Sequence, residues 1–256
     1  MIKKVPFKNN FDTAKKYDKW ATIILYVSTT LLIGGFILSQ NANASPLTIR
    51  SIEILNCITI VLYSILWFIV DYIHYGAEIY RREDLVDNSF GCLLAENRTS
   101  DYYTNDDLKS GLYKMGVNNF ESCFFSYEIA KRELYQLWIK TVCLVVIFLF
   151  IAICGYDECL IFIIQLSIPI VLLQQAIKHT FFVSRLKNVL CRYRILFNRL
   201  KNSSNENHSP EIMRNILEYE TLISWGNILL NDKIYRQMNA SLSKEWESIK
   251  KQYSIN

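Results

Sequence analysis

The sequence contains little glycine and little proline, 8 Gly and 4 Pro in 256 residues. Loops that cradle phosphate groups and sandwiches with many turns both need more of these two residues, so the composition argues against both. The sequence also lacks the common metalloprotease, hydrolase, Walker and dinucleotide-binding motifs. We therefore expect an all-α protein that is not an enzyme and uses no cofactor.

Cysteine pairs and a strong charge are absent as well. The seven cysteines include no C-x-x-C pair, which predicts reduced thiols and no zinc site. The formal net charge is only +4, and its basic residues lie beside apolar segments, which argues against a nucleic acid polymer as partner. With 51% hydrophobic and 20% charged residues, the near-zero mean hydropathy of +0.13 indicates two kinds of segment in one chain.

Four apolar windows hold most of the aliphatic residues, at 21–38, 54–70, 141–154 and 159–177. The first has no charged residue, and at about 1.5 Å per residue it nearly covers a hydrocarbon core of about 30 Å. The third window is short, but Leu137, Trp138 and a snorkelling Lys140 extend it. We expect four transmembrane helices arranged as two hairpins in a lipid bilayer, in preference to buried helices of a soluble core.

Lysine and arginine predict the orientation of these spans. Six lysines precede the first window and seven basic residues lie between 178 and 201, just after the fourth, whereas the loop between the first two windows has only Arg50. By the positive-inside rule, both termini are expected to be cytoplasmic. The expected organisation is a cytoplasmic N-terminal segment at 1–19, a membrane hairpin at 20–74, a helical cytoplasmic insert at 75–136, a second hairpin at 137–178 and cytoplasmic C-terminal helices at 179–256.

Two apolar stripes follow the last window. The first has the a/d spacing of a coiled coil and comprises Phe182, Leu186, Val189, Tyr193, Leu196 and Leu200. The second follows a helix start at Ser209-Pro210-Glu211 and comprises Ile212, Ile216, Tyr219 and Ile223. Either the two helices pack together as an antiparallel hairpin, or they form a coiled coil between subunits and make the protein a homo-oligomer. In the insert, we expect a helical run from about Asp106 that is interrupted near Gly116.

The insert also offers candidate ligand contacts. Tyr102, Tyr103 and Asn105 provide aromatic faces and an amide that suit a planar ligand. Arg81 and Arg82 provide positive charge for phosphate groups. An ordinary alternative is that the aromatic residues belong to a core and that the arginines pair with Glu78, which precedes them by three and four residues on a helix.

Polar residues lie at helical spacing within two of the expected spans. Asn56, Thr59 and Tyr63 share a face of the second, and Ser167 and Gln174 share a face of the fourth. One interpretation is hydrogen bonding between helices. The other is that these five residues line an aqueous pore that opens in an assembled or activated state.

Several cytoplasmic motifs carry a family resemblance. RREDLVDNSFG at 81–91, YYTN at 102–105, NNFESCFF at 118–125 and the segments at 232–236 and 245–250 resemble the SMODS-associated four-transmembrane effectors of bacterial anti-phage CBASS systems. The resemblance spans essentially the whole chain. It implies a multi-pass protein of the bacterial inner membrane that responds to a cyclic nucleotide second messenger, assembles or opens, and destroys membrane integrity during infection.

The sequence therefore favours a nucleotide-gated effector that forms pores or disrupts the membrane. Two alternatives stay open. One is a non-enzymatic membrane sensor or scaffold that recruits a cytoplasmic partner, and the other is a small transporter.

Overall fold

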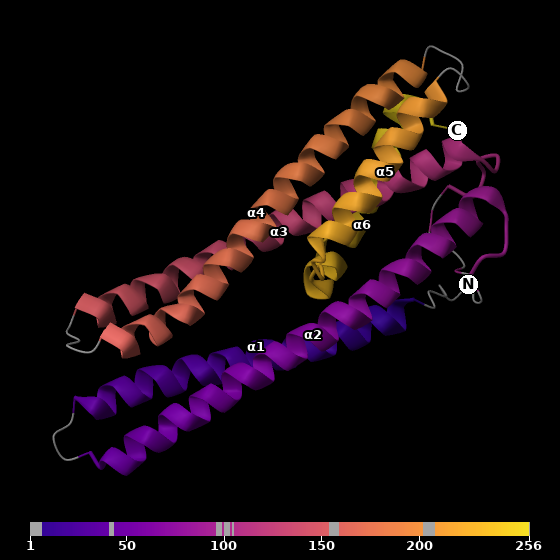
Figure 1. The fold of residues 1–256 in the computed structure, drawn as a ribbon. Coiled ribbons are helices and arrows are strands. Elements are labelled where there is room, and N and C mark those ends of the chain that lie inside the picture. Colours follow the sequence, from indigo (N-terminus) through magenta and orange to yellow (C-terminus); the bar gives the residue numbers. More distant parts are fainter. Residues whose placement is uncertain are drawn as a thin grey trace. The chain divides into compact units, whose positions relative to one another are not determined.

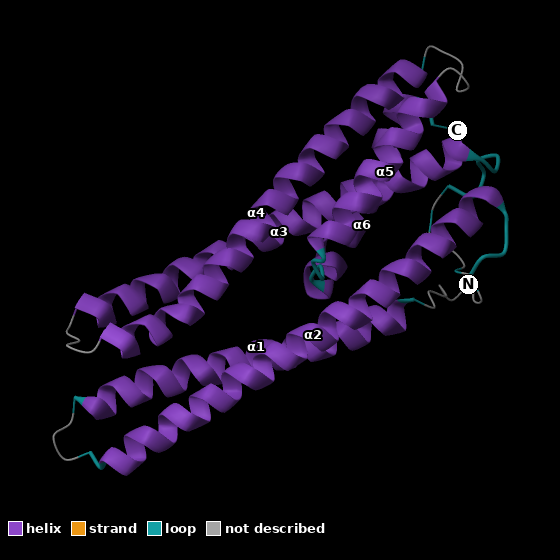
Figure 2. Cartoon of the chain, in the orientation of Figure 1, coloured by secondary structure: helices purple, strands orange, loops and turns teal. Residues whose placement is uncertain are grey.

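The chain is all-helical wherever its structure is described. The structure, a computed structural model, describes residues 7–40, 44–95, 99, 103, 105–153, 159–201 and 208–255, and of residues 148, 151–153 and 159–169 it describes the backbone alone. These residues form six α-helices and no strand (Figures 1 and 2). The helices are α1 (Lys8–Ser39), α2 (Pro46–Phe90), α3 (Leu112–Ile153), α4 (Cys159–Leu200), α5 (Ser209–Gly226) and α6 (Asp232–Tyr253).

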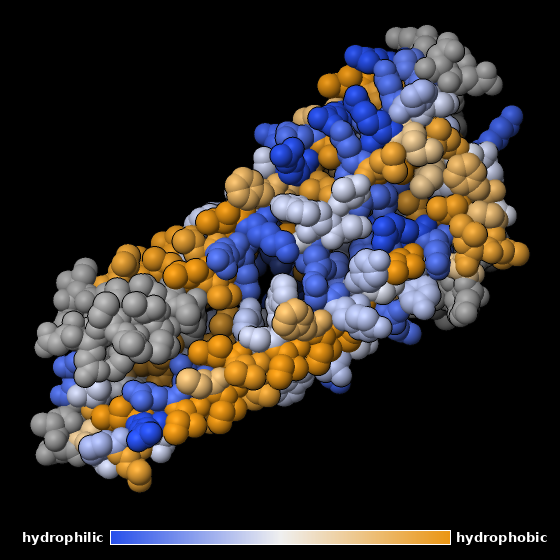
Figure 3. Space-filling model, in the orientation of Figure 1, coloured by the Kyte–Doolittle hydropathy of each residue, from blue (hydrophilic) through white to orange (hydrophobic). Residues whose placement is uncertain are grey.

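Helices α1 and α2 have the length and composition of membrane spans. Each contains an 18-residue window with a mean hydropathy of 2.1, and only 22% and 11% of the two windows are buried. A core helix of a soluble protein would be mostly buried instead. Figure 3 shows the hydrophobic side chains exposed along this helix pair. The third and fourth predicted spans fall on α3 and α4, where many side chains lie outside the described residues.

The chain divides into two compact units. Residues 9–76 and 141–174 form one, which we call the hairpin unit, and residues 1–8, 77–140 and 175–256 form the other, which we call the core unit. Of the four borders, three fall well inside helices, namely α2, α3 and α4, and the fourth follows Lys8, the first residue of α1. Three helices therefore continue from one unit into the other without an intervening loop.

In the hairpin unit, α1 and α2 are joined by a buried polar contact. The Ser28 hydroxyl of α1 donates to Oδ1 of Asn56 on α2 at 2.5 Å. A small apolar cluster of Leu25 and Leu172, with Tyr63 packed against it, connects α1, α2 and α4. Because the neighbouring exposed residues are aliphatic and aromatic, this unit presents an apolar surface.

The core unit has an aromatic centre. The Phe120 ring of α3 stacks on Phe197 of α4 at 5.1 Å and meets the edge of Trp246 of α6 at 5.2 Å. All six residues of the first predicted stripe belong to this core, together with Ile212, Ile216 and Tyr219 of α5. Burial of these apolar faces supplies the main driving force that holds α3, α4, α5 and α6 together.

The two predicted stripes pack against each other within the chain. Arg192 and Arg199 of α4 form ion pairs with Glu218 and Glu211 of α5, in the opposite order along the chain, so the two helices are antiparallel. This arrangement selects the hairpin alternative for these helices.

The expected interruption near Gly116 is wrong, because α3 begins at Leu112 and continues through this glycine. A Cβ at position 116 would lie 2.8 Å from Cγ2 of Ile212. Gly116 therefore permits α3 and α5 to approach closely instead of ending a helix.

Candidate functional site

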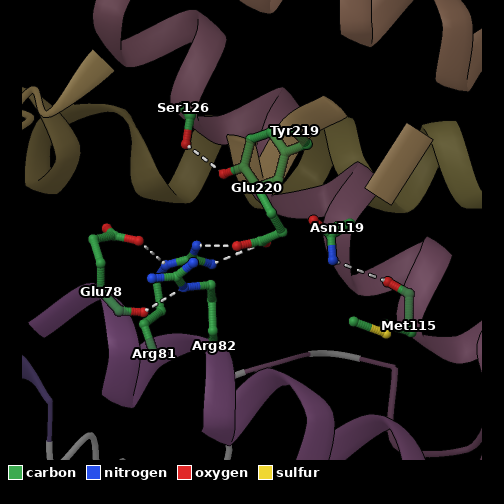
Figure 4. A network of polar contacts seen from close by, with 8 residues as sticks. All are labelled: Glu78, Arg81, Arg82, Met115, Asn119, Ser126, Tyr219 and Glu220. Carbon is green, nitrogen blue, oxygen red and sulfur yellow. Dashed lines mark hydrogen bonds and ion pairs between the residues drawn. The ribbon is translucent and has the colours of Figure 1, made fainter. Parts of the chain in front are cut away.

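A buried arginine joins α2 to α5 in the core unit. Arg81 Nε donates to Oε2 of Glu78 at 2.9 Å, one turn earlier on α2. Its Nη2 and Nη1 donate to Oε2 and Oε1 of Glu220 on α5, at 2.5 and 3.3 Å (Figure 4). Burial by itself lowers the pKa of Arg81, but Glu220 and Glu78 more than compensate and raise it well above its ordinary value. Arg81 is therefore a permanently charged link between two helices.

Tyr219 and Ser126 extend this network to α3. The Tyr219 hydroxyl lies 3.1 Å from Oγ of Ser126, and the tyrosine is buried. Burial raises the pKa of Tyr219 well above its ordinary value, although the nearby Arg81 opposes the shift. The hydroxyl stays protonated, and α2, α3 and α5 meet at one polar network inside an apolar core.

Helices α3 and α5 each contain a buried asparagine. Asn119 of α3 donates to the Met115 carbonyl at 3.4 Å, and its Oδ1 has no hydrogen-bond donor among the described residues. Oδ1 of Asn215 on α5 likewise has no donor in the described part of the chain. Both atoms can accept a hydrogen bond from water or from a polar ligand.

Arg82 has different surroundings from Arg81. Its Nε donates to the backbone carbonyl of Glu78 at 3.2 Å, and the side chain is half-buried. Among the described residues its terminal nitrogens have no carboxylate partner. The predicted pairing with Glu78 thus holds for the Arg81 side chain, while Arg82 contacts only the Glu78 backbone.

Asn105 lies in a second polar network, formed by the end of α2, the loop after it and the start of α3. Asn105 Nδ2 donates to Oδ1 of Asn118 at 3.0 Å and to Oε2 of Glu121 at 2.7 Å. Asn118 in turn donates to Oδ1 of Asn88 at 2.8 Å. Asn105 Oδ1 is buried and has no donor among the described residues. Tyr103 is buried, and Tyr102 lies outside the described residues.

Two aspartates of α2 hold the loop after this helix. Asp87 accepts from the backbone N–H groups of Leu94 and Ala95 at 2.7 and 2.8 Å. Asp84 accepts from the backbone N–H and the hydroxyl of Thr99 at 2.8 and 2.7 Å. Both aspartates are buried, so these two acidic residues of RREDLVDNSFG have structural roles.

The predicted pore residues have separate environments. Asn56 and Thr59 are buried, Asn56 against Ser28 of α1, and Thr59 donates to the Asn56 carbonyl at 2.7 Å. Tyr63 packs on the apolar cluster of the hairpin unit. Gln174 is exposed, and the side chain of Ser167 lies outside the described residues. The structure thus places Asn56 in a contact between helices, whereas the hydrogen bond of Thr59 lies within α2.

Glu220 completes the site, and its role could not be predicted from the sequence. Glu220 is 139 residues from Arg81, and no local spacing connects them. Its bidentate contact with Arg81 has the geometry that a guanidinium also offers to a phosphate group, so Arg81 is chemically suited to exchange the Glu220 carboxylate for a phosphate.

Compared with protein-family models, with curated proteins and with solved structures, the chain matches none.

Proposed function

We propose that the chain is a four-span membrane effector that permeabilises the bilayer when an anionic, nucleotide-type ligand binds its core unit. The observation that carries this proposal is the continuity of α2, α3 and α4 across the borders between the two units. A helix without a break transmits a displacement at one end to the other, because its backbone hydrogen bonds leave no hinge. A ligand bound in the core unit is thereby coupled to the hairpin unit.

The exposed residues of α3 and α4 support two spans beyond α1 and α2. On α3 the exposed apolar residues include Val142, Val146 and Phe150, and on α4 they include Ile170 and Ile177. Such side chains are stable in hydrocarbon and unfavourable in water. With the lysines before the apolar window at 21–38 and the basic residues after Ile177, the positive-inside rule gives cytoplasmic termini, and the family resemblance implies a bacterial inner membrane.

The gate in this proposal is the ion pair between Arg81 and Glu220. A phosphate group offers the same paired oxygens as the Glu220 carboxylate. Binding at Arg81 displaces Glu220, releases α5 from α2, and lets the α2 helix move. A cyclic nucleotide is the ligand class implied by the family resemblance. The freed helices then open a pore or disrupt the bilayer, in a homo-oligomer.

A leakage assay tests the proposal directly. The full chain is reconstituted into phosphatidylethanolamine and phosphatidylglycerol vesicles that contain a self-quenching dye, and cyclic dinucleotides and trinucleotides are added alongside linear ATP and GTP. We expect dye release with a cyclic nucleotide and none with the linear nucleotides. Absence of release with every cyclic nucleotide, in vesicles where carbonate extraction proves insertion, refutes the proposal.

Glu220→Gln provides a matched variant for the same assay. The neutral amide keeps the size of Glu220 but weakens its hold on Arg81, because the charge-assisted bonds are lost. We expect dye release without nucleotide, at least about 5-fold above the wild-type rate, since the loss of roughly 1 kcal/mol favours the released state. Glu218→Gln is the control, because Glu218 pairs with Arg192 on the surface and has no contact with α2 in the proposed gate.

A further inference from the structure

Helix α1 presents one exposed face that changes from basic to apolar along its length. The buried residues of α1 are Ala14, Ala21, Leu25, Ser28 and Thr29, which share the opposite side of the helix. The exposed face consists of Lys16, Lys19, Trp20, Ile23 and Val27, at helical spacing. Trp20 is 53% exposed, so its indole ring lies on the surface of the hairpin unit. We call these five residues the α1 face.

A shallow apolar hollow lies on the α1 face beyond Trp20. Among the described residues, its walls are Ile23, Tyr26, Val27, Thr30 and Leu31. All five belong to the apolar window at 21–38, the part of α1 that a bilayer surrounds with hydrocarbon. Water is not stable in such a hollow, because a water molecule needs several polar partners. A lipid acyl chain fills it instead, since its methylene groups make dispersion contacts with the walls.

The two lysines lie at the depth of the lipid headgroups. Lys19 and Lys16 precede Ala21 by two and five residues, which places them about 3 Å and about 8 Å outside the apolar window. The headgroup layer on each side of the hydrocarbon is about 5–8 Å thick. Trp20 lies at the boundary itself, where indole rings are favoured. A lipid phosphate is therefore at the same level as both ammonium groups.

The two lysines also lack a counter-charge from the protein. Both are exposed, and in the described part of the chain neither has a carboxylate within ion-pair distance. Asp18 is two residues from Lys16 and so about 200° around the helix, and Asp12 is one turn further from the apolar window. An anionic headgroup supplies the opposite charge that the α1 face lacks.

We infer that the α1 face binds one anionic phospholipid, with its phosphate at Lys16 and Lys19, its glycerol at Trp20 and one acyl chain in the hollow. The inference rests on the proposed function in one respect, the insertion of α1 into a bilayer. A zwitterionic lipid carries a cation that the lysines repel, so the charge selects the anionic class. A soluble phosphate matches the lysines but leaves the hollow empty.

Mass spectrometry of the intact chain tests this lipid preference. The full chain is released from micelles that contain equal amounts of phosphatidylglycerol and phosphatidylcholine, and the retained lipids are counted. We expect one phosphatidylglycerol per chain, preferred about 10-fold. Lys16→Gln with Lys19→Gln is expected to reduce the preference to within about 2-fold. Lys233→Gln with Lys244→Gln removes the same charge from exposed positions of α6 and is expected to keep it. Equal preference in the two double variants overturns the inference.

An exchange of neighbours distinguishes a site from general attraction to a basic segment. Asp18→Lys with Lys19→Asp keeps the net charge and the depth but moves one cation about 100° around the helix. We expect this variant to lose the preference for phosphatidylglycerol, and full retention of the preference overturns the inference. Val27→Trp fills the hollow and is expected to lower the retained phosphatidylglycerol at least about 5-fold. Unchanged retention in this variant contradicts the inferred position of the acyl chain. Carbonate extraction from vesicles verifies that each variant inserts.

A soluble headgroup tests whether the ligand is a lipid. Glycerol phosphate is added to the chain in micelles of phosphatidylcholine alone. We expect no glycerol phosphate to stay bound, and a stable adduct overturns the assignment to a lipid.

The readouts also separate this inference from the proposed function, because lipid retention is measured without nucleotide and without leakage. A preference for phosphatidylglycerol in a protein that never leaks refutes the effector while the lipid site stands. Nucleotide-dependent leakage without any lipid preference refutes the lipid site alone.

Discussion

Arg81 and Arg82 are adjacent in the sequence but make different contributions to stability. Removing the Arg81 side chain takes away the cation that pairs with the largely buried Glu78 and Glu220. We expect Arg81→Ala to lower the free energy of unfolding by about 3 kcal/mol. Arg82→Ala removes a half-buried side chain and is expected to cost less than about 0.5 kcal/mol. Thermal unfolding in detergent, followed by tryptophan fluorescence, compares the two variants.

Equal melting temperatures for the two variants contradict the buried ion-pair network.

One of the two contacts of Arg81 could be predicted from the sequence, and the other could not. The spacing of Glu78 and Arg81 predicts their contact, because residues three apart on a helix are neighbours. The contact with Glu220 could not be predicted, since it depends on which face of α5 packs beside α2.

Glycine determines how closely two elements pack at the end of α5. A Cβ at Gly226 would lie 2.5 Å from Cδ2 of Phe182, a rigid ring in the core. Gly226→Ala is expected to lower the free energy of unfolding by about 1–3 kcal/mol. Gly76 is the matched control, because its Cβ would meet nothing within 4 Å in α2. Gly76→Ala is expected to raise stability by about 0.5–1 kcal/mol. Urea unfolding of both variants measures the difference, and a destabilised Gly76→Ala or a neutral Gly226→Ala disagrees with this packing.

His179 makes the contact of α3 and α4 dependent on pH. Its Nε2 lies 3.0 Å from the Ala130 carbonyl, and burial lowers its pKa although this hydrogen bond opposes the shift. The unfolded state, with a pKa near 6.5, then binds more protons than the folded state as the pH falls. The contribution of His179 to the free energy of unfolding is therefore fully present above about pH 6.5. It decreases as the pH falls, until the pH reaches the lower pKa of the folded state.

His179→Gln tests this dependence, because an amide donates to the same carbonyl and does not titrate. We expect the melting temperature of the wild type to fall more steeply between pH 7.5 and pH 5 than that of His179→Gln. Parallel curves for the two proteins show that His179 does not contribute to the pH dependence.

In the proposed function, helices that continue from one unit into the other couple ligand binding to membrane leakage. Insertion of four glycines at the border after Lys140 breaks the continuity of α3, because glycine is the most flexible residue in a helix. We expect nucleotide affinity, measured by calorimetry, to stay within about 3-fold, and nucleotide-induced leakage to fall at least about 10-fold. The same insertion after Gln40, between α1 and α2, is the control and is expected to retain leakage. Full leakage in both proteins argues against coupling through continuous helices.

The all-helical class and the two membrane-spanning candidates α1 and α2 followed from the sequence alone. Both depend on local properties, namely hydropathy within a window and few residues that break helices. The start of α5 beside Pro210 and the apolar stripes of α4 and α5 could also be predicted, because they depend on the spacing of nearby residues. The effector function and its resemblance to the CBASS family stay predictions.

Only the tertiary structure decided which polar residues meet. Asn56 has Ser28 as its partner, Arg81 has Glu220, and Asn105 has Asn118 and Glu121. A helix pattern specifies which face is apolar, but several buried positions satisfy the same pattern. The choice among them is made when all helices pack at once, because each buried charge or amide needs a partner and only one arrangement of the backbones supplies it.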